Sequence, residues 1–138
     1  MTKIGLEIHC QLTKLQSKLF CSCMANYREF EPNHNICPVC MGLPGSLPRL
    51  NQKAVESATS IAMALSCKTP EKIAFFRKNY FYPDLPKNFQ ITQLNVYGDM
   101  SIGGEGYVDV EGAKIKIRRI QLEAVSYTHL TLPTILLV

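Results

Sequence analysis

Four cysteines form the strongest chemical pattern in this chain of 138 residues. Cys21 and Cys23 make one close pair, Cys37 and Cys40 make another, and thirteen residues lie between the two pairs. Two thiol pairs held in tight turns suit a tetrahedral thiolate site, for which zinc is the typical ion. Four thiolates leave no open coordination position, so we expect such an ion to cross-link the loop and to take no part in catalysis.

Two alternatives to a four-thiolate site stay open from the sequence. All four thiols could be free, or His34 could replace one of them as a ligand. The amino terminus lacks the apolar stretch of a signal peptide, which predicts a reducing, cytoplasmic location and favours metal binding over disulfides. Cys10 and Cys67 fall outside the two pairs, and we expect both to be small, buried hydrophobic side chains.

A second candidate site begins with Glu7 and His9. Residues 3–12 alternate between apolar and polar side chains, which predicts a half-buried strand with Glu7 and His9 on its polar face. A carboxylate and an imidazole on one face can bind a hard divalent ion. An exposed polar strand face is the commoner origin of such a pair, and the sequence alone leaves it open.

A third candidate is the basic and aromatic stretch 77–87. Its cations suit phosphate groups, its tyrosines suit an adenine ring, and its carboxylate could orient a ribose or a metal ion. The chain has no Gly-x-x-x-x-Gly-Lys, so any ATP site here is not a P-loop. A basic surface loop accounts for the same composition equally well. The candidates are Arg77, Lys78, Tyr80, Tyr82 and Asp84, with Lys87, Gln90 and Gln93 as weaker ones.

Composition is that of a single globular domain. The chain is 46% hydrophobic and carries a formal net charge of +4. This mild basic bias permits an RNA or nucleotide partner without requiring one. No run of 18 apolar residues occurs, so we expect no membrane association.

The predicted secondary-structure elements indicate an α+β fold. We expect a mostly antiparallel sheet, one helix that packs on it, and a loop held by zinc. Asn51 can cap a helix whose apolar positions recur at helical spacing from Ala54 to Leu65 and which ends before Thr69-Pro70. A short strand is expected within 89–94, followed by a turn-like segment over 98–106.

The carboxyl-terminal half predicts a hairpin and then a bulge. Residues 107–110 and 114–117 would pair around Gly112-Ala113. The apolar phase slips between Ile117 and Ile120, which indicates a bulge near Arg118-Arg119 that would re-aim Glu123.

The tail from 124 onwards does not fit this pattern. Residues 125–134 resemble the translation of a transposase-type sequencing adaptor, and Ala124 falls in the same reading frame. We therefore expect 1–123 to be the amino-terminal part of a catalytic domain and 124–138 to be an artefact.

Four blocks of this sequence, in order, resemble the B subunits of aspartyl/glutamyl-tRNA amidotransferases, the GatB family. The resemblance covers almost all of 1–123, and its most specific block is Arg-Lys-Asn-Tyr-Phe-Tyr-Pro-Asp. The archaeal E subunit shares the first block but fits the Cys-Pro-Val-Cys block less well. The blocks are Gly5–Leu12, Ser17–Cys21, Cys37–Pro48 and Arg77–Pro86.

The resemblance implies an ATP-dependent conversion of misacylated Glu-tRNA(Gln) or Asp-tRNA(Asn) to Gln-tRNA(Gln) or Asn-tRNA(Asn). In this family the side-chain carboxylate is phosphorylated with ATP and magnesium, and ammonia released by an amidase (A) subunit then displaces the phosphate. A small C subunit completes the enzyme, and neither DNA nor a membrane is an expected partner.

Carried over by position, the resemblance places magnesium at Glu7, His9 and Glu123, which would form the catalytic centre. Arg77, Lys78, Tyr80, Tyr82 and Asp84 would line the ATP and aminoacyl pocket, and the four paired cysteines would hold a structural zinc. The fold would be the truncated first part of a glutamine-synthetase-like cradle, inactive alone. The alternatives are a zinc-containing RNA-binding module without catalysis and an inert truncated product.

Overall fold

The computed structural model describes residues 4–26, 30–81, 88–94, 98 and 100–124. Consecutive strands pair into two antiparallel two-stranded sheets, β1 with β2 and β3 with β4. This confirms an α+β chain with antiparallel pairing, although the described strands form two separate ribbons. The elements are α1 (Pro38–Met41), α2 (Gln52–Ala64), β1 (Phe76–Asn79), β2 (Phe89–Thr92), β3 (Gly103–Val110) and β4 (Ala113–Ile120).

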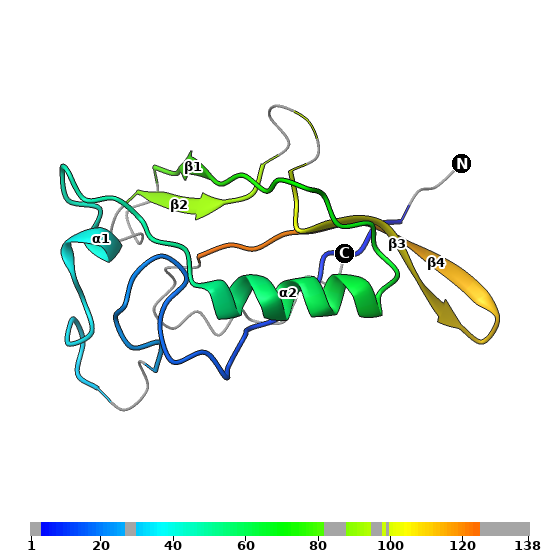
Figure 1. Cartoon of the computed structure of the whole chain (residues 1–138), viewed down its shortest axis with the longest axis horizontal. Helices are drawn as coiled ribbons and strands as arrows, with labels where there is room; N and C mark the ends of the chain where they lie inside the picture. The colour runs from blue at the N-terminus through cyan, green and yellow to red at the C-terminus, as the bar shows by residue number, and fades with distance from the viewer. Residues whose placement is uncertain (1–3, 27–29, 82–87, 95–97, 99, 125–138) are drawn as a thin grey trace.

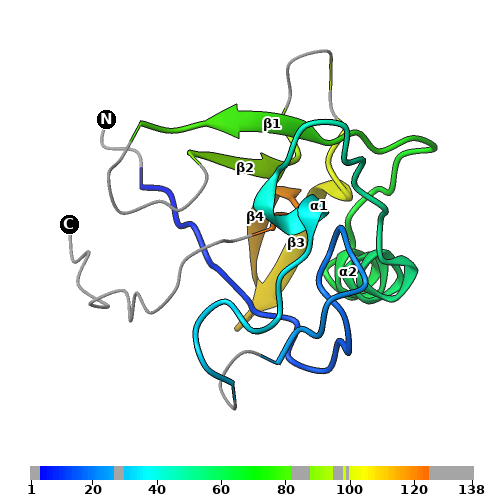
Figure 2. The same ribbon diagram turned by 90° about the vertical axis from the view of Figure 1, so that its left-hand side faces the viewer.

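The helix α2 runs along the body of the molecule, with the β1–β2 ribbon on one side of it (Figure 1). The β3–β4 hairpin extends beyond the carboxyl-terminal end of α2, and the cysteine-bearing loop with α1 lies at the opposite end (Figures 1 and 2). Among the described residues, we find no helix with the length and apolar character needed to cross a bilayer.

The capping of α2 confirms the prediction from Asn51. The Asn51 side chain accepts a hydrogen bond from the backbone N–H of Ala54, and its amide nitrogen donates to the Ser17 hydroxyl at 2.9 Å. The buried face of the helix consists of Ala54, Ala58 and Ala62. Asn51 therefore starts the helix and also ties its first turn to the loop that carries Cys21 and Cys23.

Small residues let β3 approach α2 closely. A Cβ atom built on Gly103 would lie 2.8 Å from the Cβ of Ala62, and one built on Gly106 would lie 2.2 Å from the Sγ of Cys67. The prediction of a turn over 98–106 is therefore wrong for its second half, because these glycines belong to β3. They are needed for close packing against the helix and not for a turn.

The β3–β4 hairpin turns at Glu111 and Gly112, one residue earlier than predicted. Both have positive φ, 51° and 83°, as a two-residue type I′ hairpin turn requires. The predicted bulge near Arg118-Arg119 is wrong, because the register is constant from Val110↔Ala113 to Gly103↔Ile120. The local distortion lies in the facing strand instead, at Glu105, whose φ is 52°.

The amino-terminal segment is extended but is not a strand, so the prediction for 3–12 is wrong over its described part. Its apolar side chains are largely exposed, at 89% for Ile4 and 87% for Leu6. Alternation specifies two faces, but a strand also needs a neighbour to complete its hydrogen bonds. Within the described residues no strand pairs with this segment. Cys10 is exposed, contrary to prediction, and Cys67 is half-buried.

The hydrophobic core centres on Ala58, Ile102 and Leu122. Partly buried side chains from the amino-terminal loop, α2 and β4 pack around these three, and the rings of Phe20 and Phe75 meet edge to face at 5.0 Å. The surrounding residues are Leu12, Leu19, Val55, Ile73, Phe75 and Ile120.

A fully buried glutamine joins three segments beside this core. The Gln93 carbonyl oxygen Oε1 accepts hydrogen bonds from the backbone N–H groups of Ile102 and Leu122, at 3.1 and 2.9 Å. Its amide nitrogen donates to the Met100 carbonyl at 3.0 Å. The Gln93 amide is therefore committed to backbone groups, and the prediction that it lines a ligand pocket is wrong.

We expect Gln93→Leu to lower the free energy of unfolding by at least ~2 kcal/mol, because two buried backbone N–H groups lose their acceptor. Chemical denaturation of the chain measures this. The control is Gln52→Leu, an exposed position on α2, where a change within about 0.5 kcal/mol is expected. Equal effects of the two substitutions would contradict the role assigned to the buried amide.

Candidate functional site

The four paired cysteines come together in space. The sulfur atoms of Cys21, Cys23, Cys37 and Cys40 all lie within 4.8 Å of one another, and each residue is half-buried. A tetrahedral zinc with bonds of about 2.3 Å separates its sulfur ligands by roughly 3.8 Å, so one ion fits the cluster. It is the one group of this kind found in the described part of the chain. The cluster could therefore hold a metal ion, and its donors are compatible with a structural zinc.

The second cysteine pair is shaped by the short helix α1. Cys37 is the residue before its first turn, and the Cys37 N–H donates to the Cys40 sulfur at 3.1 Å. Gly42 ends the helix in the left-handed conformation, with φ at 72°. A Cβ there would lie 2.8 Å from the Phe89 ring, so both the conformation and the contact require glycine.

Three thiols of the cluster have pKa values that are shifted from the ordinary thiol value, one downwards and two upwards. The backbone of Cys40 hydrogen-bonds to the Cys37 sulfur and, with the Cys23 thiol, lowers the pKa of Cys37 to about 7. Burial, followed by the hydrogen bond to Cys37 and the nearby Cys21, raises the pKa of Cys23 to about 12. Burial also raises the pKa of Cys21. The crowded cluster thus holds negative charge preferentially on Cys37, and a bound cation would stabilise the remaining thiolates.

The second cluster joins Glu7, His9 and Glu123 from opposite ends of the described chain. The His9 Nε2 lies 3.5 Å from a Glu7 carboxylate oxygen, and its Nδ1 lies 3.4 Å from a Glu123 carboxylate oxygen. The imidazole therefore sits between the two carboxylates. The Glu123 side chain is 30% exposed and that of Glu7 is 87% exposed, so the cluster opens to solvent on the Glu7 side.

Glu123 reaches this cluster by lying against β2. The Ala124 N–H donates to the Ile91 carbonyl at 3.0 Å, and Glu123 forms an isolated antiparallel bridge with Thr92. From the sequence we expected a bulge in the preceding strand to aim this side chain. Pairing with the edge of β2 does so instead, which periodicity within one segment could not reveal.

The β1–β2 register divides the basic stretch between two faces. Residues directly opposite each other in an antiparallel pair share a face, and neighbours along a strand alternate. Lys78 faces Gln90, which lies two residues from Thr92, the partner of Glu123. Lys78 is therefore on the same face of the ribbon as the Glu123 carboxylate. Arg77 faces Ile91 and lies on the other side.

Tyr80 is in contact with Lys78. The Tyr80 hydroxyl donates to the Gln90 side-chain oxygen, and the Lys78 ammonium lies 5.3 Å from the centroid of the Tyr80 ring. Gln90 is buried, and by accepting this hydrogen bond it supports Tyr80. Three further predicted site residues, Tyr82, Asp84 and Lys87, lie outside the described residues.

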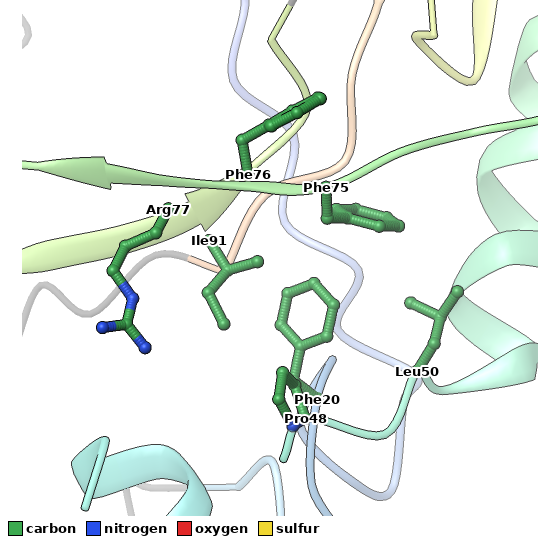
Figure 3. Close-up of a pocket in the computed structure, with 7 residues that line it drawn as sticks. All are labelled: Phe20, Pro48, Leu50, Phe75, Phe76, Arg77 and Ile91. Atoms are coloured by element: carbon green, nitrogen blue, oxygen red, sulfur yellow. The ribbon is translucent and has the colours of Figure 1, made fainter. Parts of the chain in front are cut away.

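On its other face, the ribbon borders an open pocket of about 380 Å³, lined by apolar side chains and by Arg77, that was not predicted from the sequence (Figure 3). Phe75, Arg77 and Ile91 lie on the side of the ribbon where Phe20 and Pro48 lie, whereas the Phe76 ring points to the other side. In the sequence, the extended stretch Phe75-Phe76-Arg77 already indicates that Phe75 and Arg77 share one face and Phe76 lies on the other. It could not show that the amino-terminal loop closes one of them.

Comparison with known proteins gives a consistent result. The family described as the GatB/GatE catalytic domain matches residues 2–130. The aspartyl/glutamyl-tRNA(Asn/Gln) amidotransferase B subunit of Saccharolobus solfataricus is 50% identical over 123 residues, which cover 89% of this chain and 26% of the relative. The B subunit of Methanococcoides burtonii is 51% identical over a region that covers 87% of this chain and 25% of the relative. The B subunit of Methanosarcina barkeri is 54% identical over a region that covers 80% of this chain and 21% of the relative. The chain thus spans about a quarter of these relatives.

We expect the cysteine cluster to bind one zinc ion, with an affinity that falls as pH falls. Each thiol with a raised pKa must release a proton on binding, and below pH about 7 Cys37 must release one as well. The dependence of affinity on pH should therefore steepen below that value. Competition with a chromogenic chelator between pH ~6 and ~8.5 measures it.

The matched controls for this measurement are single cysteine substitutions. Cys37→Ser should abolish tight binding, whereas Cys67→Ser, outside the cluster, should leave the stoichiometry at one ion. Retained tight binding in Cys37→Ser would show that the four thiols do not form the site.

Proposed function

Because the chain belongs to the GatB/GatE catalytic domain family, we propose that it supplies part of the kinase centre of a tRNA-dependent amidotransferase. The proposed reaction converts misacylated Glu-tRNA(Gln) or Asp-tRNA(Asn) to Gln-tRNA(Gln) or Asn-tRNA(Asn) with hydrolysis of ATP. It rests on the activity in the names of the B-subunit relatives, of which the chain spans about a quarter. The observation that carries it is the convergence of Glu7, His9 and Glu123 on the face of the β1–β2 ribbon that also bears Lys78.

The chemistry requires activation of a carboxylate. A carboxylate is a poor acyl donor, and an acyl phosphate provides the leaving group that ammonia can displace. Phosphoryl transfer depends mainly on positioning and on neutralising the phosphate charge. We propose that the two carboxylates beside His9 and the lysine on the same ribbon face supply this positioning and charge for a magnesium–phosphate complex.

Glu7, His9 and Glu123 are the residues proposed to hold magnesium. Carboxylate oxygens are the ligands that this ion prefers, and the solvent-facing Glu7 leaves room for the waters that magnesium retains. When bound, the ion would neutralise charge on the transferred phosphate. His9 lies between the two carboxylates and would position one of them through one ring nitrogen while the other nitrogen is offered to the ion.

Lys78 and Tyr80 are the described residues proposed to bind the ATP phosphates on the same face. The Lys78 ammonium provides a positive charge, and Tyr80, anchored by Gln90, holds that ammonium near its ring. Tyr82 and Asp84 remain proposed members of this pocket. Arg77 is proposed as a nucleotide-binding residue too, from the opposite face.

The zinc is proposed to be structural. It would hold the loop that packs on Phe89 and would contribute no open coordination site. An amidase subunit that releases ammonia and a small third subunit are the proposed protein partners, and misacylated tRNA is the proposed RNA partner, in the cytoplasm. Residues 1–123 would form the first part of a glutamine-synthetase-like cradle that is inactive alone.

We expect Glu7→Gln, His9→Ala and Glu123→Gln, each in the full-length subunit assembled with its partners, to reduce transamidation roughly 100-fold or more. Binding of misacylated tRNA should change less than about twofold, since these side chains are proposed to contact the ion and not the RNA. A transamidation assay and a filter-binding assay measure the two quantities. Glu71→Gln, an exposed carboxylate outside the cluster, is the matched control.

The same experiment separates this proposal from a zinc-containing RNA-binding module without catalysis. Unchanged transamidation in all three variants would reject the magnesium assignment. A full-length subunit that binds tRNA but supports no ATP-dependent amidation with its partners would favour the binding module.

A further inference from the structure

We propose that Lys18 is the positioning residue of the cysteine cluster: its ammonium joins the two cysteine pairs and balances part of the negative charge of the thiolates around a bound metal ion. This inference rests on the proposed structural zinc and on no step of the proposed reaction. Lys18 lies in the amino-terminal loop, shortly before Cys21, and is half-buried. It is not itself a ligand, since an ammonium has no lone pair to offer a metal ion.

The main chain of Lys18 is fixed to the first cysteine pair. Its backbone N–H donates to the Cys23 carbonyl at 2.9 Å, and the preceding residue, Ser17, forms an isolated antiparallel bridge with Met24. This short pairing closes the turn that carries Cys21 and Cys23. The backbone of Lys18 is therefore held beside the first pair before its side chain makes any contact.

The side chain of Lys18 reaches the second cysteine pair. Its Nζ donates to the Cys40 sulfur at 3.7 Å and to the Asn35 carbonyl, just before Cys37, at 2.5 Å. The Cys40 sulfur also accepts a hydrogen bond from the Cys37 backbone N–H at 3.1 Å. One residue thus contacts both pairs, the first through its backbone and the second through its ammonium.

The charge of Lys18 complements that of a loaded cluster. Four thiolates around one divalent ion carry a net charge of −2, and a half-buried site of that charge needs cations or N–H donors near its sulfur atoms. Among the described residues, the ion pairs between carboxylates and cations do not include Lys18. Its ammonium is therefore available to the thiolates, and a charged N–H donor binds a thiolate more strongly than a neutral donor does.

Zinc affinity tests the role of the charge. We expect Lys18→Met, which keeps the length of the side chain and removes its charge, to weaken zinc binding by the chain roughly tenfold. Lys18→Arg should bind zinc within about threefold of the parent, because it keeps the charge. The matched control is Lys14→Met, which removes the same charge from an exposed position in the same loop and should bind zinc as the parent does. Competition with a chromogenic chelator measures each affinity, and circular dichroism of the zinc-saturated chains checks that each variant is folded.

Cobalt(II) in place of zinc tests the contact with the Cys40 sulfur. A hydrogen bond from an ammonium stabilises the electrons of a thiolate, so its loss lowers the energy of the charge-transfer absorption from sulfur to cobalt. We expect this absorption band to move to longer wavelength in Lys18→Met and to stay in place in Lys14→Met. A role confined to packing of the lysine stem would leave the band in place in both variants, and that result would overturn the proposal.

The outcomes separate this inference from the proposals beside it. Equal zinc affinities of Lys18→Met and the parent, or equal weakening in Lys18→Met and Lys18→Arg, would overturn the role of the Lys18 charge and leave the structural zinc standing. A parent chain that binds no zinc would overturn both. Failure of the proposed function would instead appear as unchanged transamidation in Glu123→Gln, a result independent of zinc affinity.

Discussion

The side-chain amide of Gln93 is the interaction on which the rest of the structure depends. It directly follows β2 in the chain and, through its two polar atoms, holds the backbone at Met100, Ile102 and Leu122. The backbone carbonyl of Gln93 accepts a further hydrogen bond from the side-chain amide nitrogen of Gln121 at 2.7 Å. In a buried site the N–H groups of Ile102 and Leu122 would lose this acceptor without Gln93, whereas the Met100 carbonyl also accepts from the Ala74 N–H. Because Leu122 precedes Glu123, the same amide holds the carboxylate beside His9.

The cysteine-bearing loop is the second constraint, and it acts on the other side of the ribbon. Its segments have little regular hydrogen bonding, and the close approach of four sulfur atoms gives it a single point of closure. Contacts from this loop continue outward through Gly42 to Phe89 and, at its start, through Ser17 to Asn51. A metal ion there would stabilise the start of α2 and the Arg77 side of the open pocket together.

Two adjacent residues of β1, Arg77 and Lys78, thus lie on opposite faces of the β1–β2 ribbon. Lys78 and Tyr80 lie on the ribbon face that also carries Glu123. Arg77 lies on the opposite face, where it stacks on Phe89 and lines the pocket. Because Arg77 and Lys78 are adjacent in the sequence, sequence reasoning predicts that they line one pocket. Alternation along a strand puts them on opposite sides, and each then meets a different set of neighbours contributed by distant segments.

Local rules in the sequence determined the features that depend on neighbours along the chain: the cap of α2 at Asn51, the hairpin at Glu111-Gly112 to within one residue, and the paired thiols that could bind one ion. Only the tertiary structure decided that Gln93 is buried, that the 98–106 glycines pack against α2, that 4–12 is unpaired among the described residues, and that Glu123 reaches His9 along β2. The physical reason is that capping and turn conformations are set within a few residues, whereas register, burial and the pairing of strand edges depend on segments far apart in the sequence.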